Sequence, residues 1–208
     1  MKKVLSYLMI ITPFILNAQD HSSLTYDQTQ DVSYTQSIKN YTHFESYESE
    51  KGNKISVGDT LIIGAVSSSN KQYNQYTGAQ SVFSTIIIGK VGTAALLGMN
   101  YLGAGASTNK VIVEFVTVAH TKLKRKSPLS VAVFVRNPNI GKAMSGRTIL
   151  DIEKALSFGE IIDPNAPLTR SQAIAKLKES KDLLDLGLLS EDAYKLIKSE
   201  LTPIIMGG

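Results

Sequence analysis

The chain has 208 residues, of which 43% are hydrophobic and 19% charged, so it can form one or two small cored domains and is not a wholly disordered polymer. It contains no cysteine, which excludes disulfides, thiol catalysis and thiolate metal sites. The net charge of +4 is unevenly distributed, because residues 51–150 carry twelve basic and two acidic residues, whereas residues 20–50 carry one basic and six acidic.

The first residues have the pattern of a secretory signal peptide. Lysines at positions 2 and 3 precede an apolar run over residues 4–16, which is too short to span a bilayer as a stable helix. We predict a signal peptide over 1–18 with cleavage after Ala18; a retained N-terminal anchor stays open, because Leu16 is unfavourable near such a cut. No cysteine follows the run, so the expected product is an exported, periplasmic or secreted protein that is not a lipoprotein and has no transmembrane helix.

Residues 19–53 are rich in Ser, Thr, Gln and Tyr and poor in aliphatic residues. Their spacing follows neither the strand nor the helix period, so we predict a polar arm that is extended or disordered. The alternative is a tyrosine-bearing strand that docks on the next domain.

Residues 54–162 are predicted to form a basic β domain that ends in a short helix. Runs of β-branched residues indicate strands after the Gly58-Asp59 turn, at 82–88, 111–119 and 131–135, and a short one at 148–150; a helix is expected at 151–158. Five or so short strands favour an SH3-like or OB-like barrel, or a sandwich. With the C-terminal helices described below, the expected fold class is α+β.

The segment 86–106 is apolar and rich in Gly and Ala. A polar loop is predicted separately at 67–76. Within 86–106, Lys90 and five glycines argue against a membrane span, so we predict a flexible loop there after the strand. Its large residues are expected to cover the barrel or to form an exposed apolar patch: Leu96, Leu97, Met99, Tyr101 and Leu102.

A proline linker over 163–168 separates this domain from a predicted helical hairpin at 169–201, which a tail over 202–208 follows. Thr169 and Gln172 form a capping box, Gly187 allows the chain to reverse, Ser190 caps the second helix and Pro203 is expected to end it. Ile174, Leu177, Leu183 and Leu184 are predicted to share one face of the first helix. The residues expected to carry the interactions of the hairpin are Ile174, Leu177, Leu184, Gly187, Leu188, Leu189, Tyr194, Ile197 and Leu201.

This hairpin resembles the SHOCT family of short C-terminal helical modules. The likeness lies in the leucine pair 183–184, the run Gly187-Leu188-Leu189-Ser190, and then Glu191, Tyr194 and Lys198, while Ala193 replaces a capping glutamate of the family. The resemblance implies a module that mediates contacts. A weaker likeness links the chain to small exported proteins of Gram-negative bacteria; it lies in Val57–Leu61, Ile152–Leu156 and Gly159–Ile161. This likeness implies a domain architecture but no activity. An unrelated hairpin that packs on its own barrel is the alternative.

The leading functional hypothesis is an exported, non-enzymatic interaction protein that assembles through its hairpin, as a homo-oligomer or with a protein partner. The second is a module that binds anionic lipid or glycan through a basic face, with nucleic acid an unlikely ligand; its contacts would be Lys122, Lys124, Arg125, Lys126, Arg136, Lys142 and Arg147. These basic residues can instead form a solvated hairpin tip or lie against the acidic arm.

The third hypothesis is an enzyme of unknown type. The three histidines are isolated in the sequence, and Gly89–Thr93 lacks the spacing of a phosphate loop. We therefore expect neither catalytic residues, nor a metal site, nor a cofactor.

Overall fold

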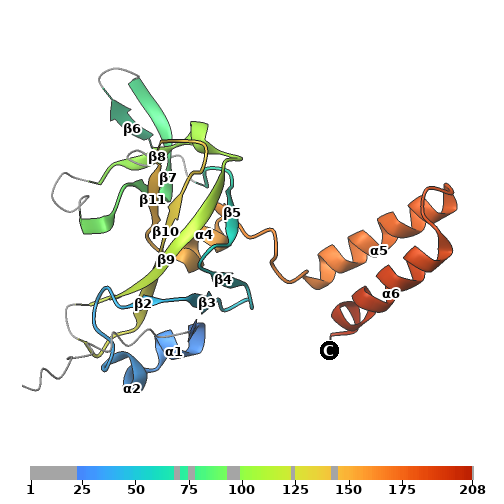
Figure 1. Cartoon of the computed structure of the whole chain (residues 1–208), viewed down its shortest axis with the longest axis horizontal. Coiled ribbons are helices and arrows are strands. Elements are labelled where there is room, and N and C mark those ends of the chain that lie inside the picture. Colours follow the sequence, from blue (N-terminus) through green and yellow to red (C-terminus); the bar gives the residue numbers. More distant parts are fainter. Residues whose placement is uncertain are drawn as a thin grey trace, which may run out of the picture.

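The computed structural model describes residues 23–67, 71–74, 78–92, 99–122, 125–141 and 145–207, so the predicted signal peptide lies outside the described residues. The fold is α+β. A curled antiparallel sheet and a small second sheet form one body, and two C-terminal helices form another part of the chain (Figure 1).

The main sheet follows the order β12-β5-β9-β10-β11-β7-β6, with β2 paired to β9 and β8 paired to β7. Its strands are β2 (His43–Phe44), β5 (Thr60–Ile63), β6 (Lys71–Asn74), β7 (Gly78–Ile88), β8 (Tyr101–Gly103), β9 (Lys110–His120), β10 (Leu129–Arg136), β11 (Gly146–Ile149) and β12 (Ile161–Ile162). The predicted strands correspond to β5, β7, β9, β10 and β11 and are confirmed. Their β-branched residues suit a pleated surface that is buried on one side.

The predicted helix at 151–158 is also confirmed, as α4 (Ile152–Ser157). The Asp151 side chain caps it by accepting a hydrogen bond from the Lys154 amide. Gly159 follows in the left-handed conformation, with φ 68°, and turns the chain into β12.

The prediction of an extended or disordered arm is wrong for residues 23–53. The segment forms β1 (Leu24–Thr25), α1 (Tyr26–Gln30), α2 (Val32–Thr35), β2 and β3 (Ser46–Glu48), and β3 pairs with β1 and with β4 (Lys54–Ser56). Four of its apolar side chains, Leu24, Ile38, Phe44 and Tyr47, are buried, whereas Val32 is exposed. These elements are too short to show a hydrophobic period, so the spacing of the apolar residues did not predict them. The alternative, a tyrosine-bearing strand that docks on the next domain, is closer to the structure.

Two predicted loops also contain strands. The polar segment 67–76 includes β6, and residues 101–106 form β8 and a short 3-10 helix, η1 (Ala104–Ala106), so they are not a flexible loop. Leu102 is buried, Tyr101 is half-buried and Met99 is exposed, while Leu96 and Leu97 lie outside the described residues. Among the described residues, we find no helix with the length and apolar character needed to cross a bilayer.

One hydrophobic core unites the former arm with the β domain. Alternate residues of β9 face it (Val111 and Val113, then Val116 and Val118), and the phase changes at a bulge where Phe115 pairs with Phe134 and Val113 with Val135. The core cluster extends along the chain from Leu24 to Ile161 and includes no residue of the C-terminal helices. Each fully buried aliphatic side chain contributes about 1.5–3 kcal/mol, so this part of the chain has its own source of stability.

The C-terminal hairpin consists of α5 (Arg170–Asp185) and α6 (Glu191–Met206), and Figure 1 shows it standing away from the β domain at the end of the linker. The capping box of Thr169 and Gln172 and the cap by Ser190 are confirmed. Pro203 does not end the second helix: α6 continues for another turn to Met206, and Gly207 follows in a left-handed conformation. A proline removes one backbone hydrogen bond and crowds the carbonyl one turn back, and here these effects fall near the end of the helix, which continues past it.

Candidate interaction surfaces

The inner face of the hairpin is built from small and large side chains. Ala173 and Ser180 of α5 and Leu201 of α6 are buried, and the predicted contacts Leu177, Leu184, Leu189, Tyr194 and Ile197 are half-buried. Sequence reasoning missed Ala173 and Ser180, whose small side chains let the two helices approach. Together with Leu177 and Leu184 they follow the helical spacing i, i+4, i+7, i+11. This pattern could have been recognised in the sequence.

The outer face of the hairpin carries large apolar side chains. Ile174 and Leu183 were predicted to share a face with Leu177, and this is wrong, because the line through Ala173 and Ser180 sets the contact and leaves both on the outside. Leu188 is 73% exposed and Leu196 is 61% exposed. The full set of exposed large apolar residues is Ile174, Leu183, Leu186, Leu188, Leu196, Ile204 and Met206.

The tip of the hairpin holds its leucines in a fixed turn. Gly187, with φ 71°, donates its amide to the Leu184 carbonyl at 2.9 Å, and Leu188 donates to the Leu183 carbonyl at 2.9 Å. This is a Schellman motif, in which the residue after the glycine commonly makes an apolar contact with a residue one turn back in the helix. The exposure of Leu186 and Leu188 therefore belongs to an ordered, hydrogen-bonded turn.

The hairpin is electrically neutral, unlike the domain that precedes it. It has six basic and six acidic residues between positions 169 and 206. Lys181 pairs with Asp185 at 2.7 Å, and Lys195 lies 3.9 Å from Glu191 and 3.6 Å from Asp192. These exposed pairs contribute little to stability, but they leave no large field of one sign around the apolar residues.

The predicted basic face is not one surface. Lys122, Arg125 and Lys126 lie at the β9–β10 turn, whereas Arg136 and Arg147 lie at the opposite end of β10, eight residues or about 25 Å away. Lys124 and Lys142 lie outside the described residues.

Arg136 and Arg147 are also partly held by contacts within the fold. Arg136 forms an ion pair with Glu114 and donates to the Ser145 hydroxyl at 3.0 Å. Desolvation by burial lowers the pKa of Arg147. Among the described residues, no ion pair joins the acids of 23–50 to Lys122, Arg125 or Lys126. The alternative in which the acidic arm lies against these basic residues is therefore not supported by an ionic contact.

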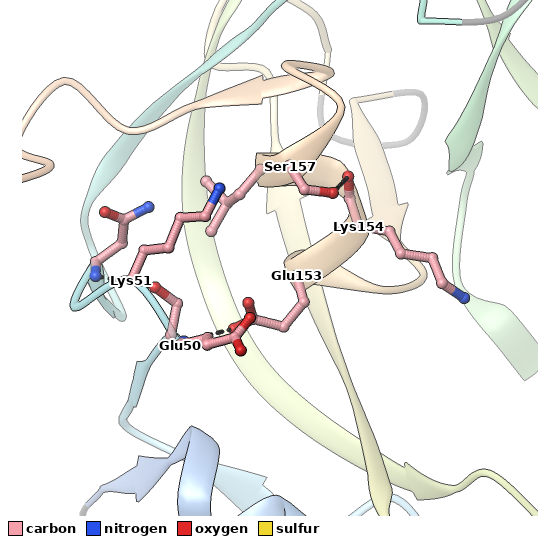
Figure 2. Close-up of a pocket in the computed structure, with 8 residues that line it drawn as sticks. Glu50, Lys51, Glu153, Lys154 and Ser157 are labelled. Carbon is pink, nitrogen blue, oxygen red and sulfur yellow. Dashed lines mark hydrogen bonds between the residues drawn. The ribbon is translucent and has the colours of Figure 1, made fainter. Parts of the chain in front are cut away.

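A polar cleft of about 140 Å³ lies between the β3–β4 turn and α4 (Figure 2). Glu153 Oε1 accepts hydrogen bonds from the Tyr47 hydroxyl at 2.7 Å and from the Glu50 amide at 3.3 Å. In Figure 2, Lys51 reaches toward α4 while Lys154 points away from the cleft. Burial, and then the contact with Glu153, raises the pKa of Tyr47.

The polar groups of this cleft hold the fold together. Ser157 donates its hydroxyl to the Lys154 carbonyl at 3.0 Å, and Ser49 accepts from the Asn53 amide at 2.9 Å. Neither serine is hydrogen-bonded to a base among the described residues. Within the same residues, we find no group of three or more His, Asp or Glu side chains placed to hold a metal ion.

The most strongly perturbed acid is Glu160, which sequence reasoning did not single out. Its carboxylate is fully buried and accepts hydrogen bonds from the amide and hydroxyl groups of Ser67, Ser84 and Thr85, four of them at 2.6–2.9 Å to Ser84 and Thr85. Burial alone would raise the pKa of Glu160, but these donors outweigh it and lower the pKa to about 2. A carboxylate so fully bound is a structural anchor and a poor proton donor.

A scan against protein-family models, a search of the curated proteins and a search of the solved structures each found no match to this chain.

Proposed function

We propose that this protein is an exported, non-enzymatic interaction protein whose C-terminal hairpin associates with the hairpin of a second copy. The observation that carries the proposal is the set of exposed leucines on an ordered hairpin that stands apart from the β domain. Monomeric proteins rarely expose apolar surface of this kind without a use for it.

Helical geometry gathers part of this surface into a row. Leu196 and Ile204 of this surface lie along one side of α6 in a row with the half-buried Ala193 and the charged Glu200, at intervals of three and four residues, next to the row that packs on α5. Leu186 and Leu188 lie at the tip of the hairpin, close to the start of that helix. The surface is therefore long enough to pair with another helix.

The neutrality of the hairpin favours a second copy as its partner. Two neutral hairpins meet without net repulsion, whereas two basic β domains repel each other. Large apolar side chains are worth about 1.5–3 kcal/mol each when fully buried, and several from each copy are comparable to the roughly 4–15 kcal/mol that association costs.

Several parts of the proposal depend on the sequence pattern. The lysines and apolar run of residues 1–16 support export, and the match around Gly187 and Ser190 supports the SHOCT resemblance. The curled sheet is consistent with a barrel of the SH3-like or OB-like type. The anionic lipid or glycan alternative is weakened, because its contacts divide between the two ends of β10.

The test is to place a charge in the apolar surface of the full chain. Leu188→Asp and Leu196→Asp are expected to convert an oligomer into a monomer in size exclusion with light scattering, with unchanged helical circular dichroism. Ala175→Asp is the matched control: it adds the same charge at an exposed position of α5 outside the row, and should leave the mass unchanged. A monomeric parent chain, or leucine variants with the parent's mass, would overturn the proposal.

A further inference from the structure

Three flat rings form a column across neighbouring strands of the main sheet. His43 of β2 stacks on Phe115 of β9, with centroids 4.7 Å apart and planes 10° apart. Phe115 stacks in turn on Phe134 of β10, at 4.8 Å and 12°. Such parallel pairs contribute about 0.5–1.5 kcal/mol beyond the area they bury.

The column does not belong to the hydrophobic core. The core is formed by the side chains that alternate with these rings, Val116 and Val118 on β9 and Val133 and Val135 on β10. Because neighbouring residues of a strand point to opposite faces, Phe115 and Phe134 lie on the other face of the sheet. Core packing therefore does not explain why three rings are stacked there.

The column is closed at one end and open at the other. At the inner end Phe134 is buried against Gly146, where a Cβ atom would lie 2.7 Å from the ring. Phe115 is half-buried, and His43 is exposed on an edge strand of two residues. No hydrogen bond of the His43 side chain and no further stacking contact of its ring with the described residues occurs, so the outer side of its imidazole has no partner among them.

A second feature marks the same edge. Tyr41 has φ 65°, a left-handed conformation that is unfavourable for a tyrosine, and it is held there by a 2.7 Å hydrogen bond from its amide to the Val118 carbonyl. Its side chain is 62% exposed. The fold thus accepts backbone strain two residues before His43 while leaving an aromatic side chain in solvent.

The Lys90 side chain next to the column favours some flat ligands over others. The Lys90 ammonium lies 5.8 Å from the centroid of Phe115 and 5.5 Å from that of Phe134, so one cation stands over two rings of the column, while His43 itself belongs to the acidic segment 20–50. A flat ring with an attached phosphate gains from stacking and from the nearby Lys90 cation, whereas a neutral sugar ring gains from stacking alone.

We propose that the open end of the column, at His43, two residues after Tyr41, is a stacking site for the neutral heteroaromatic base of a nucleotide, whose phosphate carries the negative charge. The ligand ring continues the column beyond the imidazole. This inference is independent of hairpin association, because no residue of α5 or α6 takes part.

The experiment is a titration of the full chain with adenosine monophosphate, followed by NMR of the histidine rings. The chain has only three histidines, so the signals are few, and a His43→Gln variant assigns the one of interest. We expect a ring-current shift of the His43 protons that saturates. His120 serves as the internal reference, since its ring nitrogens contact the Ile38 and Ser127 carbonyls.

Two further ligands and two variants decide the interpretation. Ribose 5-phosphate has the charge without the base, and methyl glucoside has a ring without the charge; neither should shift His43. These variants lack the His43 signal, so their binding is measured by isothermal titration calorimetry: His43→Ala should weaken binding at least ten-fold, while His43→Phe, which keeps a flat ring, should retain it. The proposal is overturned if adenosine monophosphate gives no shift, if ribose 5-phosphate or the glucoside gives an equal one, or if His43→Ala binds like the parent.

Discussion

Glu160 illustrates how one side chain joins three segments of this fold. Its carboxylate binds Ser67 after β5 and Ser84 and Thr85 in the middle of β7, where the pairing with β8 is irregular. Its own carbonyl accepts from the Gly64 amide at 2.9 Å. The donors of β7 are turned toward a charge, so losing the charge leaves several buried groups without an acceptor.

Glu160→Gln should therefore destabilise the fold by roughly 3 kcal/mol at pH 7, because a neutral amide cannot accept all these hydrogen bonds. Urea denaturation measures the difference. Glu179→Gln, an exposed change of the same kind on α5, is the control and should have almost no effect.

The acid dependence of stability should follow from the same group. The pKa of Glu160 falls from an ordinary 4.5 to about 2 on folding, so its contribution is complete above pH 4.5 and is lost as the pH falls toward 2. Asp163 acts in the opposite direction, since burial raises its pKa, but it is present in parent and variant alike. The stability difference between the parent and Glu160→Gln should shrink between pH 7 and pH 3, and parallel pH curves would contradict this account.

At the scale of elements, the end of β5 and the turn between α4 and β12 touch through their backbones. A Cβ atom on Gly64 would lie 1.9 Å from the Gly159 carbonyl oxygen, and neither backbone can move without disturbing the Ile63–Ile161 pairing. Glycine is required at position 64 because of this close approach.

Gly64→Ala should consequently cost roughly 3 kcal/mol of folding free energy, measured as a shift of the urea midpoint. Gly141→Ala provides the comparison: a Cβ atom there meets nothing within 4 Å, so the change should be close to neutral. Equal midpoints for the two variants would show that the contact at Gly64 is not tight.

Some of the helices and strands could be predicted from the sequence, and others could not. Strands β9 and β10 follow from long runs of β-branched residues, and α4, α5 and α6 follow from Asp151, Thr169 and Ser190 as caps. The segment 23–53 was not predictable in this way. Its elements are two to five residues long, and their burial depends on partners far away in the chain, such as β9 for β2.

The candidate sites were predictable to a similar extent. The capped hairpin and its turn at Gly187 could be predicted, but which side faces outward depended on Ala173 and Ser180, small residues that a search for apolar stripes passes over. The ring column could not be predicted, because His43, Phe115 and Phe134 come together only through the pairing of three strands.

The whole molecule divides into a basic β domain with its own core and a neutral hairpin with exposed leucines. The residues of 163–168 connect them, and the core contains nothing from beyond Ile161, so the β domain should fold without the hairpin. This division supports our proposal that the hairpin assembles copies of the chain, while the β domain offers surfaces for other contacts.

The most direct test of that central claim is the mass in solution of the chain from residue 19, with and without residues 169–208, by sedimentation equilibrium over a range of concentrations. The longer chain should show a concentration-dependent mass above that of a monomer, and the shorter chain should stay a folded monomer at every concentration. Monomeric masses for both, or the same oligomer for both, would contradict the account.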